Sequence, residues 1–451
     1  MTIQEYLSSL RGKTAAVLGI GVSNTPLIEL LCRNGVQVIA CDKKSREDLG
    51  ERAKQLEALG AHLQLGEGYL DDLRADVVFR TPGMRPDVPA LLDARSRGSV
   101  VTSEMEIFFE VCPCTIIGVT GSDGKTTTTS IIAEMLRAVG KTVYLGGNIG
   151  HPLLCDAEKM QPEDFAVVEL SSFQLLDMKR SPHIAVMTNL APNHLDVHRD
   201  MAEYIDAKKH IFTRQTAQDV LILNADNTIT AGFAPEAAGE VRMFSRQTVP
   251  AHGASFRDGV IRRDGVPVVR QDEIKIPGLH NVENYMAAIL AVAGLASDED
   301  IRYVARNFGG VEHRIEFVRE KDGVKFYNDS IASSPSRTIA GLRSFSEKVI
   351  LIAGGYDKHI PYDVLGPEIA AHVRLLVCTG ATGPKIAAAA RAVPDAPEVL
   401  EIPDFYDAVH AAAQQAKPGD IVLLSPASAA FDRFKNFMVR GAEFKKTVMA
   451  L

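Results

Sequence analysis

The sequence predicts an α/β protein made of three successive units, each built around a doubly wound parallel sheet. Three observations support this fold class. Short apolar runs typical of strands alternate with helical stretches along the chain. A glycine-rich loop stands between one strand-like run and a long helical pattern. The length of 451 residues corresponds to three domains at about 150 residues each.

The first hundred residues alternate strand and helix signals. An apolar run at 14–19 ends in glycine and is followed by a helical stretch at 25–34. Further strand signals lie at 36–42, which ends in an acidic residue, and at 76–79. Strand, helix and strand at this spacing indicate parallel strands that are joined by crossover helices.

The rest of the chain repeats this pattern twice. The second unit opens with a strand at 115–120 and a helix at 126–139, and a helix at 285–293 closes it. Between them we expect a small hairpin at 253–270 and strands at 165–170, 184–189 and 220–224. The third unit begins near residue 311, with strands expected at 348–353, 374–378 and 420–424.

The composition is that of a folded globular chain. Apolar residues make up 46% and charged residues 24%, which excludes a disordered chain. A net charge of −8 argues against a broad nucleic-acid-binding or anionic-membrane surface. No run reaches the roughly 18 apolar residues of a membrane span, and the first residues lack the pattern of a secretory signal. We therefore expect a cytoplasmic protein.

The six cysteines are sparse, which indicates reduced thiols. Cys112-Pro-Cys114 resembles a metal or redox pair, but no second pair stands at ligand spacing. Small buried residues at the entry of a strand are the simpler interpretation.

The strongest local signal is the segment Thr120-Gly-Ser-Asp-Gly-Lys-Thr126 between a strand and a helix. Its backbone N–H groups and the helix N-terminus form a cradle for phosphate. Lys125 would reach the outer phosphates, and the hydroxyl of Thr126 would bind Mg²⁺. Val119 stands where the full P-loop pattern has its first glycine. A plain glycine-rich turn with a surface lysine is the alternative, which the strand–loop–helix context disfavours.

A second glycine-rich turn, Gly19-Ile-Gly21-Val-Ser-Asn24, follows the first strand. It resembles a dinucleotide-binding fingerprint with Asn24 in place of the third glycine. Asp42 lies about 20 residues further on, where an acid bonds a ribose or a neighbouring group. Tight strand-to-helix turns often carry two glycines, so the signal supports a nucleotide diphosphate without specifying NAD. Thr81-Pro-Gly83 offers more backbone donors or is simply a turn.

Polar residues also follow other strands. Glu169 ends a predicted strand of the same unit as the P-loop. A carboxylate at the carboxyl end of a strand near a P-loop suits Mg²⁺. His194 beside Asp196 is, by itself, typical of a surface or capping pair. Lys208 lies on a helical segment, where a lysine is usually solvated. Asn284 shares a helix face with Asn281, although helix capping explains Asn281 nearly as well.

Taken together, these pieces resemble one family. The segments T-G-S-D-G-K-T, G-G-N148-I-G, E169-L-S-S-F-Q, N-H194-L-D, Y-x-x-x-K208, H280-N-x-x-N284, H313-R314 and N-D329-S occur in the order of the Mur ligases. The two ends, G-I-G-V-S-N and S-P-A-S-A-A-F-D-R-F-K-N-F437-x-x-R-G, are similar to the member that adds D-glutamate. The resemblance covers nearly the whole chain. It implies a Rossmann-like UDP-substrate domain at 1–105, a P-loop ATPase domain with a parallel sheet at 106–311, and a Rossmann-like domain at 312–451 that completes the ATP and amino-acid sites.

The resemblance also implies roles for individual residues. Those that would bind ATP are Gly121, Ser122, Asp123, Gly124, Lys125, Thr126, Thr127, Asn284, Arg314 and Asp329. Those that would contact the UDP-substrate are Val22, Ser23, Asp42, Thr81, Asn148, Ser171 and His194. Those around D-glutamate would be Ser333, Lys358 and Phe437. Two Mg²⁺ ions would be held by Thr126, Glu169, His194 and a carbamylated Lys208. The catalytic residues would be Lys125, His194 and Lys208.

The implied activity is that of an ATP-dependent amide ligase of peptidoglycan precursor synthesis. It would join D-glutamate to UDP-N-acetylmuramoyl-L-alanine through an acyl phosphate. Its partners would be these small molecules, with no nucleic acid and no membrane span, and the chain would be a monomer.

Three positions depart from the family pattern: Asp123 stands for the usual Asn, Ile331 for a frequent Lys, and Ala430 for a common Ser. Either backbone N–H groups and Arg337 compensate for the missing cation and hydroxyl, or the amino-acid site differs in detail.

Other interpretations stay open at this point. Sister Mur ligases and folylpolyglutamate synthase are the nearest, and the K-N-F437 tail favours D-glutamate addition over other Mur steps. A non-catalytic sensor of UDP-sugars is disfavoured by the intact set of Lys125, Glu169, His194 and Lys208. An NAD-dependent oxidoreductase is suggested only by the first glycine-rich turn, and the P-loop with Glu169 argues against it.

Overall fold

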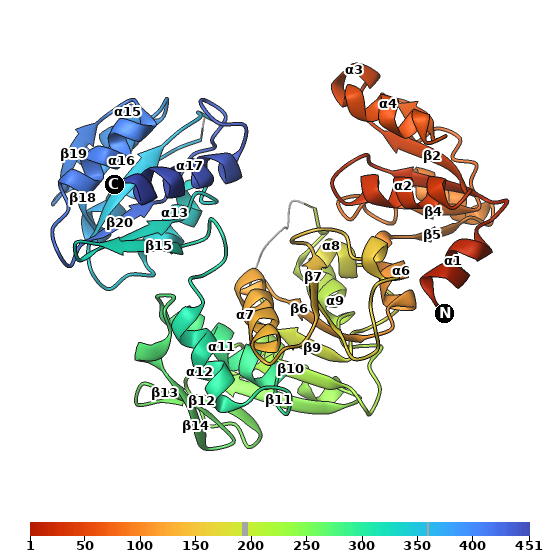
Figure 1. Cartoon of the computed structure of the whole chain (residues 1–451), viewed down its shortest axis with the longest axis horizontal. Coiled ribbons are helices and arrows are strands. Elements are labelled where there is room, and N and C mark those ends of the chain that lie inside the picture. The colour runs from red at the N-terminus through yellow and green to blue at the C-terminus, as the bar shows by residue number, and fades with distance from the viewer. Residues whose placement is uncertain (192–196, 359) are drawn as a thin grey trace. The chain divides into compact units, whose positions relative to one another are not determined.

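The computed structural model describes residues 1–191, 197–358 and 360–451. The chain divides into two compact units, which are Met1–Gln271 with Glu283–Val304 and Asp272–Val282 with Ala305–Leu451. The first unit contains two sheets and the second contains one (Figure 1). The α/β class predicted from the sequence is confirmed. The three sheets lie within 1–105, 106–311 and 312–451 respectively, and the domain boundaries themselves stay a prediction.

The first sheet is fully parallel, with the strand order β3-β2-β1-β4-β5. In chain order its strands are β1 Thr14–Leu18, β2 Gln37–Asp42, β3 His62–Leu65, β4 Val77–Phe79 and β5 Val100–Thr102. The helices of this region are α1 Ile3–Ser9, α2 Asn24–Arg33, α3 Arg46–Leu49, α4 Glu51–Ala58 and α5 Pro89–Ser96. The order reverses between β1 and β4. Ligands of such sheets bind at the carboxyl ends of the strands at this point.

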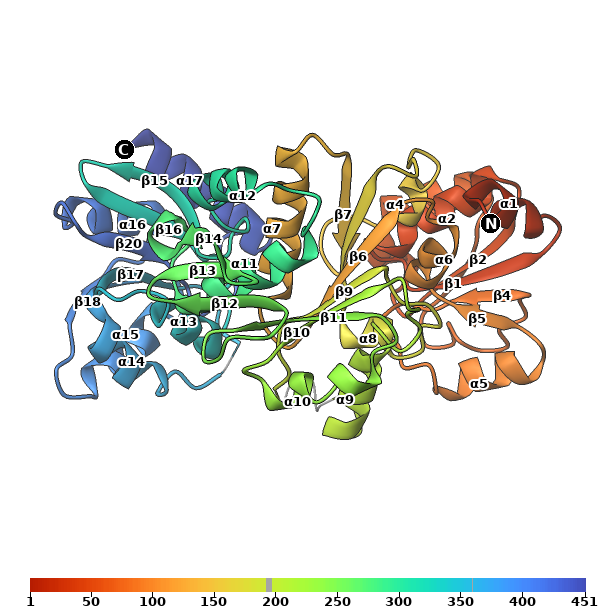
Figure 2. The same cartoon turned by 90° about the horizontal axis from the view of Figure 1, so that it is seen from below.

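The second sheet has nine strands in the order β14-β13-β12-β11-β10-β9-β6-β8-β7. Its strands are β6 Thr115–Thr120, β7 Val143–Gly147, β8 Phe165–Glu169, β9 Ile184–Met187, β10 Val220–Asn224, β11 Glu240–Ser245, β12 Gly253–Arg257, β13 Val260–Arg263 and β14 Val266–Arg270. The helices of this region are α6 Glu104–Val111, α7 Lys125–Ala138, α8 Ser172–Leu175, α9 Met201–Lys209, α10 Thr228–Ala231, α11 Leu279–Ala291 and α12 Asp298–Asn307. Helix α7 packs on β6, β7 and β8 (Figure 2).

One prediction about this region is wrong in part. Residues 253–270 form three strands and not a separate hairpin. β12 pairs in parallel with β11 and so continues the main sheet, and only β13 and β14 add antiparallel strands. The sequence analysis missed strand β11, which is the neighbour that β12 pairs with.

The third sheet, in the second unit, has the order β15-β16-β20-β17-β18-β19. Its strands are β15 Glu316–Lys321, β16 Val324–Asn328, β17 Val349–Gly354, β18 Val373–Thr379, β19 Glu398–Glu401 and β20 Ile421–Leu424. Its helices are α13 Pro335–Leu342, α14 Leu365–His372, α15 Gly383–Arg391, α16 Phe405–Gln414 and α17 Phe437–Ala450. Only β15 pairs antiparallel with its neighbour β16.

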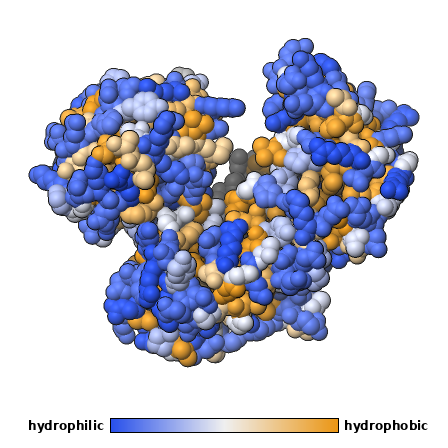
Figure 3. Space-filling view, in the orientation of Figure 1, coloured by the Kyte–Doolittle hydropathy of each residue, from blue (hydrophilic) through white to orange (hydrophobic). Residues whose placement is uncertain are grey.

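Central strands are apolar on both faces, which is why the sheets are doubly wound. Along β1, Ala15 and Val17 belong to one core cluster, and Ala16 and Leu18 belong to another. Strand β17 of the third sheet divides its alternate residues between two clusters in the same way. Because successive side chains of a strand point to opposite faces, both faces must be covered by helices. Hydrophilic residues cover much of the surface seen in Figure 3.

Two sequence expectations concern the whole chain. In the described part of the chain, no helix is long and apolar enough to cross a membrane. Cys112 and Cys114 lie with their Sγ atoms 3.5 Å apart just before β6, and Cys114 is buried. No third His, Cys, Asp or Glu completes a metal site with them among the described residues.

Candidate active site

The predicted phosphate loop bridges β6 and α7, as its position in the sequence requires. Gly121 has φ +148° and Gly124 has φ +77°, which is backbone that glycine adopts without strain. A Cβ on Gly124 would lie 2.4 Å from Oδ1 of Asn284. The same Asn284 oxygen accepts a hydrogen bond from Thr128 Oγ1 at 3.1 Å. The structure therefore brings Asn284, predicted as an ATP ligand, against the loop.

The loop is held by the segment that follows β9, the strand next to β6 in the sheet. Backbone N–H groups of Ser122 and Asp123 donate to the carbonyl and side-chain oxygens of Asn189, at 2.9 and 3.0 Å. Lys125 Nζ donates to the carbonyls of Gly121 and Ser122 at 3.0 and 2.9 Å. The first-turn N–H groups of α7 have no carbonyl acceptor within the helix, and they add their positive potential to the charge of Lys125. The arrangement suits an anion such as phosphate.

Oxygen donors suited to a metal ion lie at the carboxyl end of β8. The Glu169 side chain is 1% exposed and accepts a hydrogen bond from Thr126 Oγ1 at 2.6 Å. Asn148 Nδ2 donates to its other oxygen at 2.7 Å. A hydroxyl beside a buried carboxylate is a hard-oxygen set of the kind Mg²⁺ takes. Thr126 and Glu169 thus fit a divalent metal ion, and the Asn148 amide orients the carboxylate.

Lys208 is a buried lysine on α9. Its side chain is among the largest that are fully buried, and Nζ donates to Thr120 Oγ1 at 3.0 Å and to the Gly121 carbonyl at 2.9 Å. Burial, and then the charge of Lys125, hold the pKa of Lys208 well below its ordinary value. Lys208 is therefore not the solvated lysine that a helical segment usually carries, and the metal-binding role that the family resemblance implies for it stays a prediction. The adjacent Lys209 turns away and pairs with Glu236 at 2.5 Å.

The candidate UDP-substrate contacts gather at the switch point of the first sheet. Asp42 does not extend free into solvent: its carboxylate accepts the backbone N–H groups of Ile20 at 2.6 Å and Lys44 at 2.9 Å. A Cβ on Gly19 would lie 3.4 Å from the Cβ of Thr81. Val22 and Ser23 are exposed where α2 begins.

Two other predicted substrate contacts lie near the second sheet. Asn148 contacts Glu169, as described. Ser171 caps α8 by accepting the N–H of Gln174 at 3.3 Å. His194, with the neighbouring Asp196, lies outside the described residues.

In the second unit, Asp329 is deeply buried. Its carboxylate accepts Ser425 Oγ at 2.7 Å and the N–H of Ile315 at 3.3 Å. Burial raises the pKa of Asp329 to about 7. Arg314 lies between His313, with φ +64°, and Ile315, with φ +42°, in a tight turn. Arg314, predicted to bind ATP, therefore directly precedes the residue whose N–H bonds the other predicted ATP residue, Asp329.

The candidate amino-acid residues are distributed over three segments of this unit. The ring of Phe437, at the start of α17, lies 5.9 Å from that of His313. Ser333 follows β16, and Lys358 is exposed after β17. Arg337 Nη1 donates to the carbonyl of Ile331 at 3.3 Å, so a cation does lie beside this departure from the family pattern.

Sequence reasoning did not single out Arg440, which lies on α17 and joins the segment after β16 to the segment after β20. It is 2% exposed. Its guanidinium donates to Ser330 Oγ and the Ser330 carbonyl at 3.0 and 2.9 Å, and to the carbonyls of Ser428 and Ala429 at 3.0 and 3.1 Å. The arginine in the F437-x-x-R-G tail was the available signal, but its partner Ser330 lies 110 residues away in the sequence.

A glycine-rich phosphate loop, a buried carboxylate beside a hydroxyl and a buried lysine, at the edge of a mainly parallel sheet, are the parts of which ATP-dependent phosphoryl-transfer sites are built. Residues 119–292 match the Mur ligase middle domain, and residues 313–428 match the Mur ligase glutamate ligase domain. The chain belongs to the Mur ligase family.

Close relatives match along the full chain. The UDP-N-acetylmuramoylalanine–D-glutamate ligase of Acetivibrio thermocellus is 52% identical over 460 residues, which cover 100% of this chain and 99% of the relative. The ligase of the same name from Clostridium perfringens is 48% identical over 450 residues, covering 98% of each chain. The family predicted from the sequence motifs is confirmed.

Solved structures support the fold alone. The UDP-N-acetylmuramate–alanine ligase of Thermotoga maritima superposes with a TM-score of 0.61 at 18% identity, covering 97% of this chain and 99% of that one. A UDP-N-acetylmuramoyl-L-alanyl-D-glutamate–2,6-diaminopimelate ligase gives 0.58 at 18% identity, covering 92% of each.

Proposed function

We propose that the chain is an ATP-dependent ligase that joins D-glutamate to UDP-N-acetylmuramoyl-L-alanine in peptidoglycan precursor synthesis. The observation that carries the proposal is the P-loop assembled with Glu169 and the buried Lys208. It stands in a chain about half identical, over its full length, to ligases of that name. The proposal assigns 1–105 to UDP-substrate binding, 106–311 to ATP turnover and 312–451 to the amino-acid site, in a cytoplasmic monomer.

The reaction has two steps. The alanine carboxylate of the UDP-substrate attacks the γ-phosphate of ATP, which gives an acyl phosphate and ADP. The amine of D-glutamate then attacks the activated carbonyl, and phosphate leaves. Carboxylate and γ-phosphate are both anions, so the site must offset their repulsion as they approach. Lys125 and the first-turn N–H groups of α7 would hold the phosphates and take up the developing charge.

Mg²⁺, when bound, would supply further positive charge to offset the repulsion between the two anions. Thr126 and Glu169 would hold the first of two ions. Lys208, as its carbamate, and His194 would hold the second. A low pKa favours the carbamate, because the amine adds CO₂ only in its neutral form.

Residues of the domain at 312–451 would supply the remaining contacts. Arg314 and Asp329 would contact ATP, while Ser333, Lys358 and Phe437 would surround D-glutamate. Arg440 would keep the segments that contain Ser330 and Ser428 in place relative to each other. Arg337, beside Ile331, would supply the cation that a lysine provides in other family members.

The proposal predicts strict substrate dependence. ADP release should require UDP-N-acetylmuramoyl-L-alanine and D-glutamate together, because the acyl phosphate forms on the first and is consumed by the second. We would measure ADP across a matrix of UDP-muramoyl precursors and amino acids. Equal turnover with L-glutamate, or with UDP-N-acetylmuramate lacking L-alanine, would contradict the assignment. Preference for another pair from the matrix would indicate a sister ligase.

Lys358 should select the amino acid. It is exposed after β17, where a cation can meet the side-chain carboxylate of D-glutamate. Lys358→Ala should raise the apparent KM for D-glutamate by about tenfold or more, the value of one charge-assisted contact, with little change for ATP. Lys348→Ala, at the other end of β17, is the matched control. A change confined to the KM for ATP would instead assign Lys358 to the nucleotide site.

A further inference from the structure

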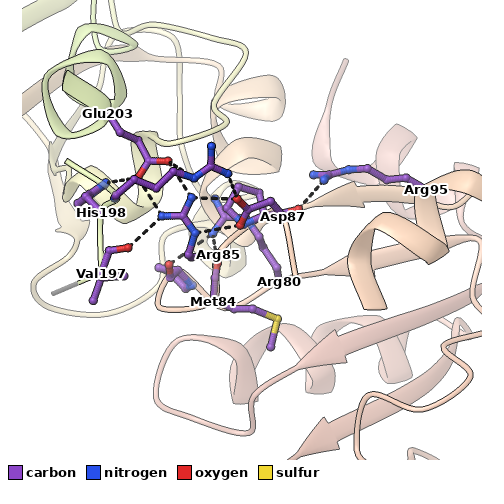
Figure 4. Close-up of polar contacts among 11 residues, drawn as sticks. Arg80, Met84, Arg85, Asp87, Arg95, Val197, His198 and Glu203 are labelled. Atoms are coloured by element: carbon purple, nitrogen blue, oxygen red, sulfur yellow. Dashed lines mark hydrogen bonds and ion pairs between the residues drawn. The ribbon is translucent and has the colours of Figure 1, made fainter. Parts of the chain in front are cut away.

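Two arginines in the loop after β4 join the first sheet to the helices that follow β8 and β9 (Figure 4). Arg80 is 1% exposed, donates to the Phe173 carbonyl at 3.2 Å and forms an ion pair with Asp177. It also donates to the carbonyl of Met84 at 3.1 Å within its own loop. Arg80 therefore fixes the segment that contains Thr81 against α8.

Arg85 uses all five of its N–H donors. Nε and Nη2 donate to the two oxygens of Asp87, at 2.9 and 3.0 Å. Nη2 and Nη1 donate to the two oxygens of Glu203, at 2.7 and 2.9 Å, and Nη1 also donates to the Val197 carbonyl at 2.9 Å. Hydrogen bonding from Arg85 lowers the pKa of Glu203 to about 2. Lysine cannot reproduce this planar fork.

The partner Glu203 lies on the helix that carries the buried lysine. Glu203 and Lys208 are both on α9, separated by about 7.5 Å of helix rise. Further along α9, Tyr204 OH contacts Ser122 Oγ at 2.9 Å. Helix α9 is thus held at its first turn by Arg85 and along its length by the phosphate loop, through Tyr204 and Lys208.

We propose that Arg85 is a positioning residue that sets helix α9, and with it Lys208, relative to the loop holding the candidate substrate contact Thr81. The inference rests on the proposed function and assigns a role to a residue outside its substrate and ATP contacts. Its basis is geometric. A rotation or shift of α9 breaks the bidentate contact with Glu203 and the bond to Val197 together. Asp87, in the same loop as Arg85, keeps the guanidinium oriented toward the helix.

The test compares the full chain with Arg85→Ala, Arg85→Lys, Glu203→Ala and the Arg85→Ala/Glu203→Ala double variant. Ligation is measured against ATP, D-glutamate and Mg²⁺. Arg85→Ala should lower kcat about tenfold and raise the Mg²⁺ concentration for half-maximal rate severalfold, as loss of a supporting contact does at metal sites. The KM for D-glutamate should change less than twofold. Arg85→Lys should be intermediate, and the double variant no worse than the worse single one.

Arg97→Ala is the matched control, because Arg97 also pairs with two carboxylates, Asp72 and Asp93, but within the region of the first sheet. It should retain wild-type kcat and Mg²⁺ requirement. If Arg85→Ala does not fold, Arg85→Lys and Glu203→Gln give the same two readouts.

Wild-type kcat and Mg²⁺ requirement in a folded Arg85 variant, with only a lower melting temperature, would overturn the inference and leave a purely structural contact. Additive losses in the double variant would also overturn it, since Arg85 would then act independently of Glu203. Failure of the wild-type chain to ligate would contradict the proposed function, and the inference with it.

Discussion

Lys208→Ala should nearly abolish ligation, by about three orders of magnitude or more, equivalent to about 4 kcal/mol of transition-state stabilisation. The amine is buried against Thr120 and Gly121, and its pKa is held low. A neutral amine there can add CO₂, which converts a cation that would repel Mg²⁺ into a hard oxygen ligand. Turnover of substrate-saturated enzyme, with and without bicarbonate, is the measurement.

Lys209→Ala is the control for Lys208, because the neighbouring lysine pairs with Glu236 instead. It should keep near-normal turnover. Small carboxylates such as acetate should partly rescue Lys208→Ala by supplying the missing oxygens. The carbamate would be refuted by electron density for an unmodified Lys208 pointing into solvent in a substrate-bound crystal. Full activity of Lys208→Ala in bicarbonate-free buffer would refute it equally.

Lys125→Ala should lower turnover by about two orders of magnitude or more, because this ammonium offsets charge that develops at the γ-phosphate, a contribution of about 3 kcal/mol. The fold should persist, since the contacts of Nζ with the Gly121 and Ser122 carbonyls lie within the loop itself. Single-turnover ADP formation separates the chemical step from binding, and thermal unfolding checks the fold.

Lys141→Ala, just beyond the other end of α7, is a matched control for Lys125 and should leave turnover unchanged. Near-normal turnover of a folded Lys125→Ala variant would mean that the loop is only a turn.

Much of the candidate site could be predicted because its residues follow strands. The phosphate loop follows β6, Glu169 ends β8, and Asp42 ends β2. Carboxyl ends of parallel strands meet at one edge of a sheet, so a strand pattern alone gathers such residues. The prediction was weaker where strands are short or half exposed. β3, β5 and β19 have three or four residues, and the sequence analysis missed all three.

The contacts by which Arg80, Arg85 and Arg440 join separate segments could not be predicted, because those partners are remote in the sequence. Arg80 pairs with Asp177 at a separation of 97 residues, and Arg85 with Glu203 at 118. Arg440 meets Ser330 at a separation of 110. A charged residue is buried only where partners satisfy it, and no local pattern states which partners will arrive.

The sequence by itself determined the α/β class, the position of the phosphate loop and the family, because strand–loop–helix order and motif spacing are local properties of the chain. Only the tertiary structure decided the state of Lys208, which a helical pattern places in solvent and the fold buries against the phosphate loop. It also decided the surroundings of Asp42, whose carboxylate accepts the backbone N–H groups of Ile20 and Lys44. Desolvation and hydrogen bonding depend on what packs around a group, and that environment comes from segments far apart in the chain.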